Sequence, residues 1–503
     1  MPARFQTARY VFSVLLLALV SHPSIAQYPN IIVILADDMG SDSVSAFNES
    51  LGFKTPRLDR LVKESMIFTD GHSGSAVCSP TRYGLLTGRY AWRSRLKRGV
   101  IQSWDAPLIE EERLTIGAML QRKGYHTACI GKWHLGWNWP FRSEEEVPVG
   151  DKKELADLAS KGVAWTNPIL GGPVDRGFDY HFGDDIINWA PFVYIENRKA
   201  LSAPELANGW KAADSDWAEV EVLPKITANA VAYIEKQAKT EQPFFLYFPM
   251  TSPHAPIAPS DPFKGISGIS PYVDFVMQTD HSIGQLVDAV EQAGIAENTL
   301  IIVTADNGTS LNFPQNDGTL DKGVSFNTNL RGGKADIWEG GHKVPFIVRW
   351  PGHVKASSQN DTPVCLTDIM ATVADITGVD LPDSSAEDSV SFLPALLSKT
   401  FKRDAIIHHS ITGKFAIREG EWKLAFSSGS GGWASPKDAE ADKLNLPKLQ
   451  LYNISEDPLE TTNRFKEHPE LVQRLTEKLR GIIQNGRSTK GAYQSNVGET
   501  WMP

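Results

Sequence analysis

Cysteine is scarce in this sequence, and so are positive charge and long hydrophobic runs. Only Cys78, Cys129 and Cys365 occur in 503 residues, too few for a disulfide scaffold, so stability must come from a hydrophobic core. We interpret Cys129 and Cys365 as buried free thiols, although they could pair. Lys and Arg total 50 against 60 Asp and Glu, giving a formal net charge of −10. That charge, with no basic stripe, argues against nucleic acid as a partner.

One apolar run stands near the N-terminus, at residues 11–20. Arg4 and Arg9 precede it, and a small-x-small cleavage pattern follows at residues 24–26. The run is shorter than the roughly 20 apolar residues that a membrane-spanning helix needs, which disfavours a membrane anchor. We therefore predict that residues 1–26 are a secretory signal peptide, and that the mature protein is secreted or periplasmic without stable membrane insertion.

Short β-rich runs alternate with amphipathic helices over residues 27–391, which we expect to form the main domain. The expected buried strands are 30–35, 126–130, 244–248, 299–304 and 345–350. The expected helices are 56–64, 115–123, 226–236, 273–292 and 366–376. Such alternation predicts an α/β fold with a large, mostly parallel sheet.

The pattern changes after about residue 392. Residues 392–503 contain expected strands at 405–409, 414–418, 422–426 and 449–452, a helix at 469–483 and a polar tail. This predicts a smaller C-terminal subdomain with an antiparallel sheet and one helix. The Gly/Ser stretch 427–432 is either a flexible loop or a lid, and the loop interpretation is favoured.

Acidic residues follow two of the expected buried strands. Asp37 and Asp38 come after the strand 30–35, and Asp306 and Asn307 after the strand 299–304. Ligands bind beyond the carboxyl ends of strands in open α/β sheets. An isolated Asp pair is more often a helix cap, but the two pairs together supply four hard oxygen donors. Such donors favour Ca²⁺ or Mg²⁺ over Zn²⁺.

A second motif contains Cys78, Pro80 and Arg82. Pro80 suits a first helical turn, which would place Cys78 at a helix N-terminus with Arg82 one turn further on. The positive end of the helix dipole and the guanidinium would favour negative charge at the cysteine. A lone cysteine is more often inert, but this context points to a nucleophile beside a fixed cation.

These motifs resemble the sulfatase family of the alkaline-phosphatase-like superfamily, which carries a Cys-x-Pro-x-Arg signature followed by Leu-Thr-Gly-Arg. The two segments stand at residues 78–82 and 86–89. Further family blocks match in order at 37–38, 131–136, 253–256, 306–308, 333–334, 338–341 and 451–463. The resemblance covers nearly the whole mature chain. It implies an alkaline-phosphatase-like three-layer sandwich with a large mixed sheet and a smaller C-terminal subdomain.

The resemblance also implies chemistry at these positions. A formylglycine-generating maturase would oxidise Cys78 to Cα-formylglycine, whose hydrated aldehyde attacks the sulfur of a sulfate monoester. The metal, Ca²⁺ or alternatively Mg²⁺, would be bound by that residue with Asp37, Asp38, Asp306 and Asn307. Arg82 and His134 would steady the hydrate. The sulfate oxygens would contact Lys132, Lys334 and His254, and His254 would protonate the departing alcohol.

Other activities of the superfamily remain open. Phosphonate monoester hydrolases can share the Cys-x-Pro-x-Arg signature, so a phosphonate or phosphate monoester hydrolase is the main alternative. Zinc-dependent relatives usually have His at the position of Asn307, which argues against a two-zinc phosphatase. A non-catalytic binder of sulfated glycans is disfavoured because every expected site position is retained.

The substrate is indicated only by aromatic and short polar residues near the motifs. Trp137, Asp185, Asn188 and His408 are our candidate substrate-binding residues, because aromatic faces and short polar side chains suit a carbohydrate. Their segments resemble a secreted bacterial branch that acts on sulfated glycans, often as 6-O-sulfatases of galactose or N-acetylgalactosamine. We hypothesise an exo-acting glycan 6-O-sulfatase.

Overall fold

The structure is a computed structural model that describes residues 28–143, 160–207, 211–213, 217–326 and 329–503. The predicted signal peptide lies outside the described residues. Among the helices in these ranges, none is both long and apolar enough to span a bilayer.

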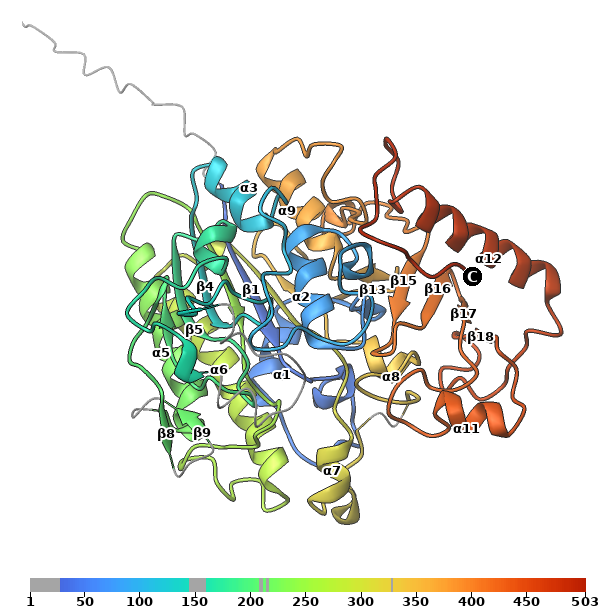
Figure 1. The fold of residues 1–503 in the computed structure, drawn as a ribbon, viewed down its shortest axis with the longest axis horizontal. Coiled ribbons are helices and arrows are strands. Elements are labelled where there is room, and N and C mark those ends of the chain that lie inside the picture. Colours follow the sequence, from blue (N-terminus) through green and yellow to red (C-terminus); the bar gives the residue numbers. More distant parts are fainter. Residues whose placement is uncertain (1–27, 144–159, 208–210, 214–216, 327–328) are drawn as a thin grey trace, which may run out of the picture.

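A ten-stranded mixed sheet forms the centre of the molecule (Figure 1). Its strands, in spatial order, are β13 (Ser358–Asn360), β2 (Met66–Phe68), β12 (Ile347–Arg349), β11 (Thr299–Ala305), β1 (Asn30–Ala36), β10 (Phe244–Pro249), β4 (His126–Lys132), β5 (Tyr180–Asp184), β6 (Ile195–Glu196) and β7 (Lys199–Ala200). The run from β11 to β5 is parallel. These central strands are apolar and buried because helices cover both of their faces.

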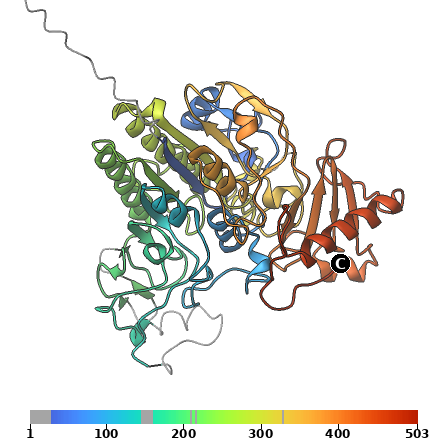
Figure 2. The ribbon, with the colours of Figure 1, turned by 90° about the horizontal axis from the view of Figure 1, so that it is seen from above.

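Two groups of helices cover the sheet (Figures 1 and 2). The first contains α1 (Pro56–Lys63), α5 (Glu219–Gln237) and α6 (Pro271–Gln292), and the second contains α2 (Cys78–Thr87), α3 (Ile116–Arg122) and α9 (Asp368–Thr377). Gly124 and Gly294 follow α3 and α6 with φ of +89° and +71°, the left-handed conformation that ends helices. The sequence-predicted three-layer arrangement is confirmed.

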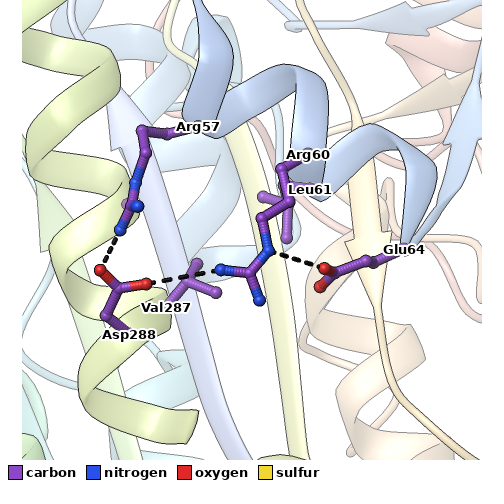
Figure 3. Close-up of a pocket in the computed structure, with 7 residues that line it drawn as sticks. Arg57, Arg60, Leu61, Glu64, Val287 and Asp288 are labelled. Carbon is purple, nitrogen blue, oxygen red and sulfur yellow. Dashed lines mark hydrogen bonds and ion pairs between the residues drawn. The ribbon is translucent and has the colours of Figure 1, made fainter.

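Ion pairs connect α1 and α6 at the surface of the molecule (Figure 3). Asp288 of α6 contacts Arg57 and lies 3.6 Å from Arg60 Nη1, while Arg60 Nε lies 2.8 Å from Glu64. Partly exposed pairs of this kind contribute only ~0–1 kcal/mol each. The pocket they line holds about 10 Å³, so we assign it a packing role.

A separate antiparallel sheet follows in the chain. It consists of β15 (Ile406–His409), β16 (Phe415–Glu419), β17 (Trp422–Ala425) and β18 (Gln450–Asn453) in that order. Helix α12 (Pro469–Gln484) buries Leu475, Leu479 and Ile483 in the same apolar cluster as this sheet. Figure 2 shows these elements to one side of the large sheet. The predicted four strands and helix are therefore present.

Three local predictions need correction. The strand expected at 345–350 is only three residues long, and it runs antiparallel to β11. Local composition does not determine the direction in which a strand pairs with its neighbour. Helix α5 begins at Glu219, seven residues before the expected 226. The Gly/Ser stretch is a loop, as favoured, but it is packed, since Ser430 is fully buried and its amide donates to the Pro436 carbonyl.

Candidate active site

The sheet topology brings the acidic segments together. Strands β1 and β11 pair in parallel with Ala36 opposite Ala305, so Asp37 and Asp306 leave the sheet side by side. The Asp38 amide donates to Asp306 Oδ1 over 3.1 Å. Asp38 has φ of +65°, a conformation uncommon for residues other than glycine and frequent at functional sites.

The carboxylates fit a hard divalent cation. Asp37, Asp38 and Asp306 are each at most 1% exposed, and burial together with the Asp37 charge raises the pKa of Asp306 to about 7. Asn307 Oδ1 is buried and has no hydrogen-bond partner among the described residues. Crowded carboxylates and a free amide oxygen are the ligands that Ca²⁺ and Mg²⁺ take.

Three cationic side chains surround this cluster. Lys132 Nζ lies 2.5 Å from Asp37 Oδ2, and Lys334 Nζ lies 2.7 Å from Asp38 Oδ1. Arg82 donates to Asp306 Oδ2 over 2.8 Å and to the Lys132 carbonyl over 2.9 Å. Burial alone would raise the pKa of Asp37, but Lys132 and the other nearby cationic groups hold it well below its usual range. The three cationic side chains therefore offset the charge of the three carboxylates.

Cys78 is the first residue of α2 and faces the carboxylates. Its Sγ lies 3.7 Å from Asp37 Oδ1, and the residue is 2% exposed. Burial raises the pKa of the Cys78 thiol to about 12. The thiolate is the nucleophilic form, so the unmodified side chain is a poor nucleophile at neutral pH.

Two histidines complete the cluster in defined tautomers. His134 Nε2 donates to the Ile101 carbonyl over 2.9 Å, which leaves the buried Nδ1 as a proton acceptor without a hydrogen-bond partner in the described chain. His254 Nδ1 donates to the Ala255 carbonyl over 2.6 Å, and its Nε2 lies 3.7 Å from Asp38 Oδ2. Burial, with Lys334 nearby, lowers the pKa of His254 to about 4.

Lys334 and His254 are the most exposed of these side chains, at 8% and 9%, and mark the approach to the cluster. Trp433, 41% exposed, lies beside Lys334, with its ring centre 6.0 Å from Lys334 Nζ. Asp336 Oδ1 accepts from the amides of Trp433 and Ala434, which fixes the backbone there. Trp433 was not among the predicted site residues, although it directly follows the Gly/Ser stretch.

The four candidate substrate-binding residues lie in different surroundings. Trp137 is buried against Trp133 and Trp139, while Asp185 interacts with the Trp137 side chain and the His134 backbone. Burial raises the pKa of Asp185 to about 8. Asn188 is half-buried. His408 lies in a separate cluster, where its ring stacks on His342 at 3.8 Å.

The mixed sheet, with carboxylates, lysines and histidines at the ends of its central strands, defines an alkaline-phosphatase-like hydrolase of anionic esters. The family model Sulfatase matches residues 29–379. The chain therefore belongs to the sulfatase family and is a sulfuric ester hydrolase.

The chain is similar to several named sulfatases and to a solved structure. The chain is 30% identical to an N-acetylgalactosamine-6-O-sulfatase of Bacteroides thetaiotaomicron, covering 91% of this chain and 93% of the relative. It is 27% identical to the human N-acetylgalactosamine-6-sulfatase, over 81% and 73% of the two chains. A structure from work on glycosaminoglycan metabolism by B. thetaiotaomicron superposes with a TM-score of 0.79 and 29% identity, covering 91% of this chain and 99% of that one.

Proposed function

We propose that this protein is a secreted or periplasmic sulfatase that removes 6-sulfate groups from galactose or N-acetylgalactosamine residues at the ends of sulfated glycans. The observation that carries the proposal is the convergence of the sulfatase-type site residues on the carboxylates at one edge of the sheet, from Asp37 just after β1 to Lys132 at the end of β4. The named activity of the B. thetaiotaomicron relative supports the choice of sugar and position.

The chain's residues suit a calcium ion and a formylglycine at position 78. Asp37, Asp38, Asp306 and Asn307 would hold the Ca²⁺, or a Mg²⁺ in its place. A maturase would convert Cys78, whose thiol is held protonated by burial. When present, the cation offsets negative charge on the ester, and the hydrated aldehyde supplies a hydroxyl for attack on sulfur.

The other side chains bind sulfate and move protons. Lys132 and Lys334 bind the nonbridging sulfate oxygens, because both ammonium groups already converge on the carboxylate cluster. Arg82 is a positioning residue that holds Asp306 and the end of β4. His134 Nδ1 accepts a proton from the group at position 78.

His254 donates a proton to the leaving alcohol. Its Nε2 must first take up that proton, because Nδ1 already donates to the Ala255 carbonyl. Burial and Lys334 lower its pKa to about 4 in the free protein, and a bound anionic ester opposes this lowering by its negative charge.

Recognition of the sugar involves the exposed rim of the site. Trp433 offers a flat apolar face next to Lys334, and sugar rings pack on such faces. Asn188 provides an amide for a hydroxyl group, and Asp185 interacts with the Trp137 side chain and with the His134 backbone. His408 lies in β15, where its ring stacks on His342.

A panel of sulfated sugars tests this proposal. Matured protein with Ca²⁺ should release sulfate from 6-sulfated galactose and N-acetylgalactosamine, faster from chain ends than from internal residues. Release from 4-sulfated N-acetylgalactosamine or 6-sulfated glucosamine alone would contradict the stated specificity. Turnover of a phosphonate monoester without sulfate release would favour the alternative hydrolase, and binding without any turnover would favour a glycan-binding protein.

A further inference from the structure

Lys334 lies in a tight turn whose backbone is held by several contacts. The Asp336 amide donates to the Gly333 carbonyl over 3.0 Å, so the turn closes around Lys334. The Lys334 amide donates to the Thr309 carbonyl over 2.9 Å. Ala335 has φ of +82°, a left-handed conformation that is strained for residues other than glycine and persists only where the surrounding structure imposes it. These contacts therefore hold the backbone at Lys334 in one conformation.

The Asp336 carboxylate joins this turn to a second segment. Its Oδ2 accepts from the Gly333 amide over 2.9 Å, and its Oδ1 accepts from the amides of Trp433 and Ala434 over 2.7 and 3.0 Å. Asp336 is 1% exposed, which leaves these bonds little contact with water. Hydrogen bonds to a carboxylate are stronger than those between neutral groups. One side chain thus holds both the turn that carries Lys334 and the backbone of Trp433.

The loop that carries Trp433 packs closely against the turn. The Ile337 amide donates to the Ser430 carbonyl over 2.8 Å. A Cβ atom added to Gly432 would lie only 2.5 Å from Asp336 Oδ1, so the approach requires a residue without a side chain. The loop and the turn therefore pack as one unit.

We propose that Asp336 is a positioning residue that couples sulfate binding by Lys334 to sugar recognition by Trp433. The inference rests on the proposed function, in which Lys334 binds the sulfate group and Trp433 the sugar ring. Lys334 Nζ lies 6.0 Å from the centre of the Trp433 ring, and Asp336 bonds the backbone of both segments. A 6-sulfate stands one carbon atom further from the sugar ring than a sulfate on a ring hydroxyl. The spacing that Asp336 sets therefore selects between sulfated positions.

Kinetics of the full-length matured protein test the proposal. Each variant is assayed on 6-sulfated N-acetylgalactosamine and on nitrophenyl sulfate, which has no sugar ring, and inorganic sulfate is used as a competitive inhibitor. Asp336→Ala should lower kcat/KM for nitrophenyl sulfate ~10-fold, because small misplacements of binding groups are costly, and should raise the inhibition constant of sulfate. It should also lower the ratio of kcat/KM for the sugar to that for nitrophenyl sulfate by ~3–10-fold, the size of a lost aromatic contact.

Double variants separate the two sides of this coupling. Adding Asp336→Ala to Trp433→Ala should not lower the sugar-to-nitrophenyl ratio further, because both changes remove the same contact. Adding Asp336→Ala to Lys334→Ala should change kcat/KM for nitrophenyl sulfate little. If Asp336 only stabilised the fold, the losses in each pair would instead be independent and additive.

Gly432→Ala disturbs the same contact from the other side and leaves Asp336 intact. The added Cβ must push the loop away from the turn, so the sugar-to-nitrophenyl ratio should fall as it does for Asp336→Ala. Asp280→Ala is the matched control. Asp280 is 2% exposed, and its two carboxylate oxygens accept from the amides of Arg57 and Leu58 in α1. Its loss should lower stability and leave the ratio unchanged.

Three results would overturn the proposal. They are a wild-type ratio in both Asp336→Ala and Gly432→Ala, additive losses in the double variants, or an equal fall of the ratio in Asp280→Ala. Gly432→Ala keeps the test decisive if Asp336→Ala does not fold. Wild-type protein that hydrolyses nitrophenyl sulfate but not the 6-sulfated sugar would contradict the proposed substrate instead. The coupling would then depend on the inhibition constant of sulfate, which Asp336→Ala must still raise.

Discussion

The catalytic cluster around Asp37 and a histidine cluster around His342 are both buried and dense in ionisable groups, but they differ in access. The histidine cluster consists of three rings in contact, those of His72, His342 and His408. His254 and Lys334 in the catalytic cluster are 9% and 8% exposed, whereas each histidine of the other cluster is 0% exposed. A substrate can reach only the first cluster.

The two clusters also differ in how their charges are balanced. In the catalytic cluster, Lys132 and Lys334 form ion pairs with carboxylates that follow a strand of the parallel sheet. A bound anion can compete with these carboxylates for the two lysines. Beside the histidine cluster, Lys423 lies between Glu339 and Glu460, and all three side chains are fully buried. Similar residue types therefore lie at an accessible site in one place and in a fully buried cluster in the other.

Removal of the proposed general acid should have the largest effect. Replacing His254 with Ala should lower kcat on a sugar sulfate by ~10²–10⁴-fold, the usual contribution of general acid catalysis. An aryl sulfate has a better leaving group, so kcat on an aryl sulfate should fall much less. Steady-state kinetics on both substrates measure the difference, with the exposed residue His353 replaced by Ala as control. Equal losses on both substrates would show that His254 does not protonate the leaving group.

The pH dependence sharpens the same assignment. The acid must be protonated, so activity should fall as pH rises through the pKa of His254. That pKa is lowered to about 4 in the free protein and is raised by the negative charge of bound ester. The alkaline limb of kcat should therefore lie at higher pH than that of kcat/KM, and His254→Ala should remove it. Coincident limbs for kcat and kcat/KM would contradict this account.

Removal of a sulfate-binding charge should have the next largest effect on activity. Lys334→Ala removes an ammonium group that is poised for the anion and should lower kcat/KM by ~10²–10³-fold, as for other oxyanion donors. Lys334→Arg keeps the charge and should recover part of the loss. Kinetics on a 6-sulfated sugar provide the measurement, and a wild-type-like value for Lys334→Ala would exclude a direct contact with sulfate.

The buried ion pairs of Lys423 with Glu339 and Glu460 should affect stability more than activity. Lys423→Met leaves Glu339 and Glu460 buried without their cation and should cost ~3–5 kcal/mol of unfolding free energy. Chemical denaturation measures this loss, and kcat of the folded protein should stay close to wild type. Lys443→Met, at an exposed lysine, is the matched control. A large fall in kcat at unchanged stability would reverse the roles that we assign to the two regions.

The smallest expected effect is at the rim. Trp433→Ala should raise KM for a sugar sulfate by ~3–10-fold, the size of a lost aromatic contact, while KM for a small aryl sulfate changes little. Trp501, 49% exposed and packed on Phe415, provides a control position. An unchanged KM for the sugar would place recognition elsewhere.

The sequence predicted that Asp37 and Asp306 lie close together because both residues belong to local patterns. Asp37 and Asp306 follow buried apolar runs that can only be central strands, and parallel pairing then places them together. The antiparallel direction of β12, the contact of Lys423 with Glu339 and the meeting of His72, His342 and His408 could not be predicted. Each depends on segments far apart in the sequence, with no spacing that signals their contact.

The most direct test of the account is peptide mass spectrometry across position 78, on protein made with different amounts of maturase, alongside sulfate release from a 6-sulfated sugar. The account predicts that kcat per chain rises in proportion to the fraction of formylglycine and vanishes when Cys78 is unmodified. Full activity with unmodified Cys78 would contradict it.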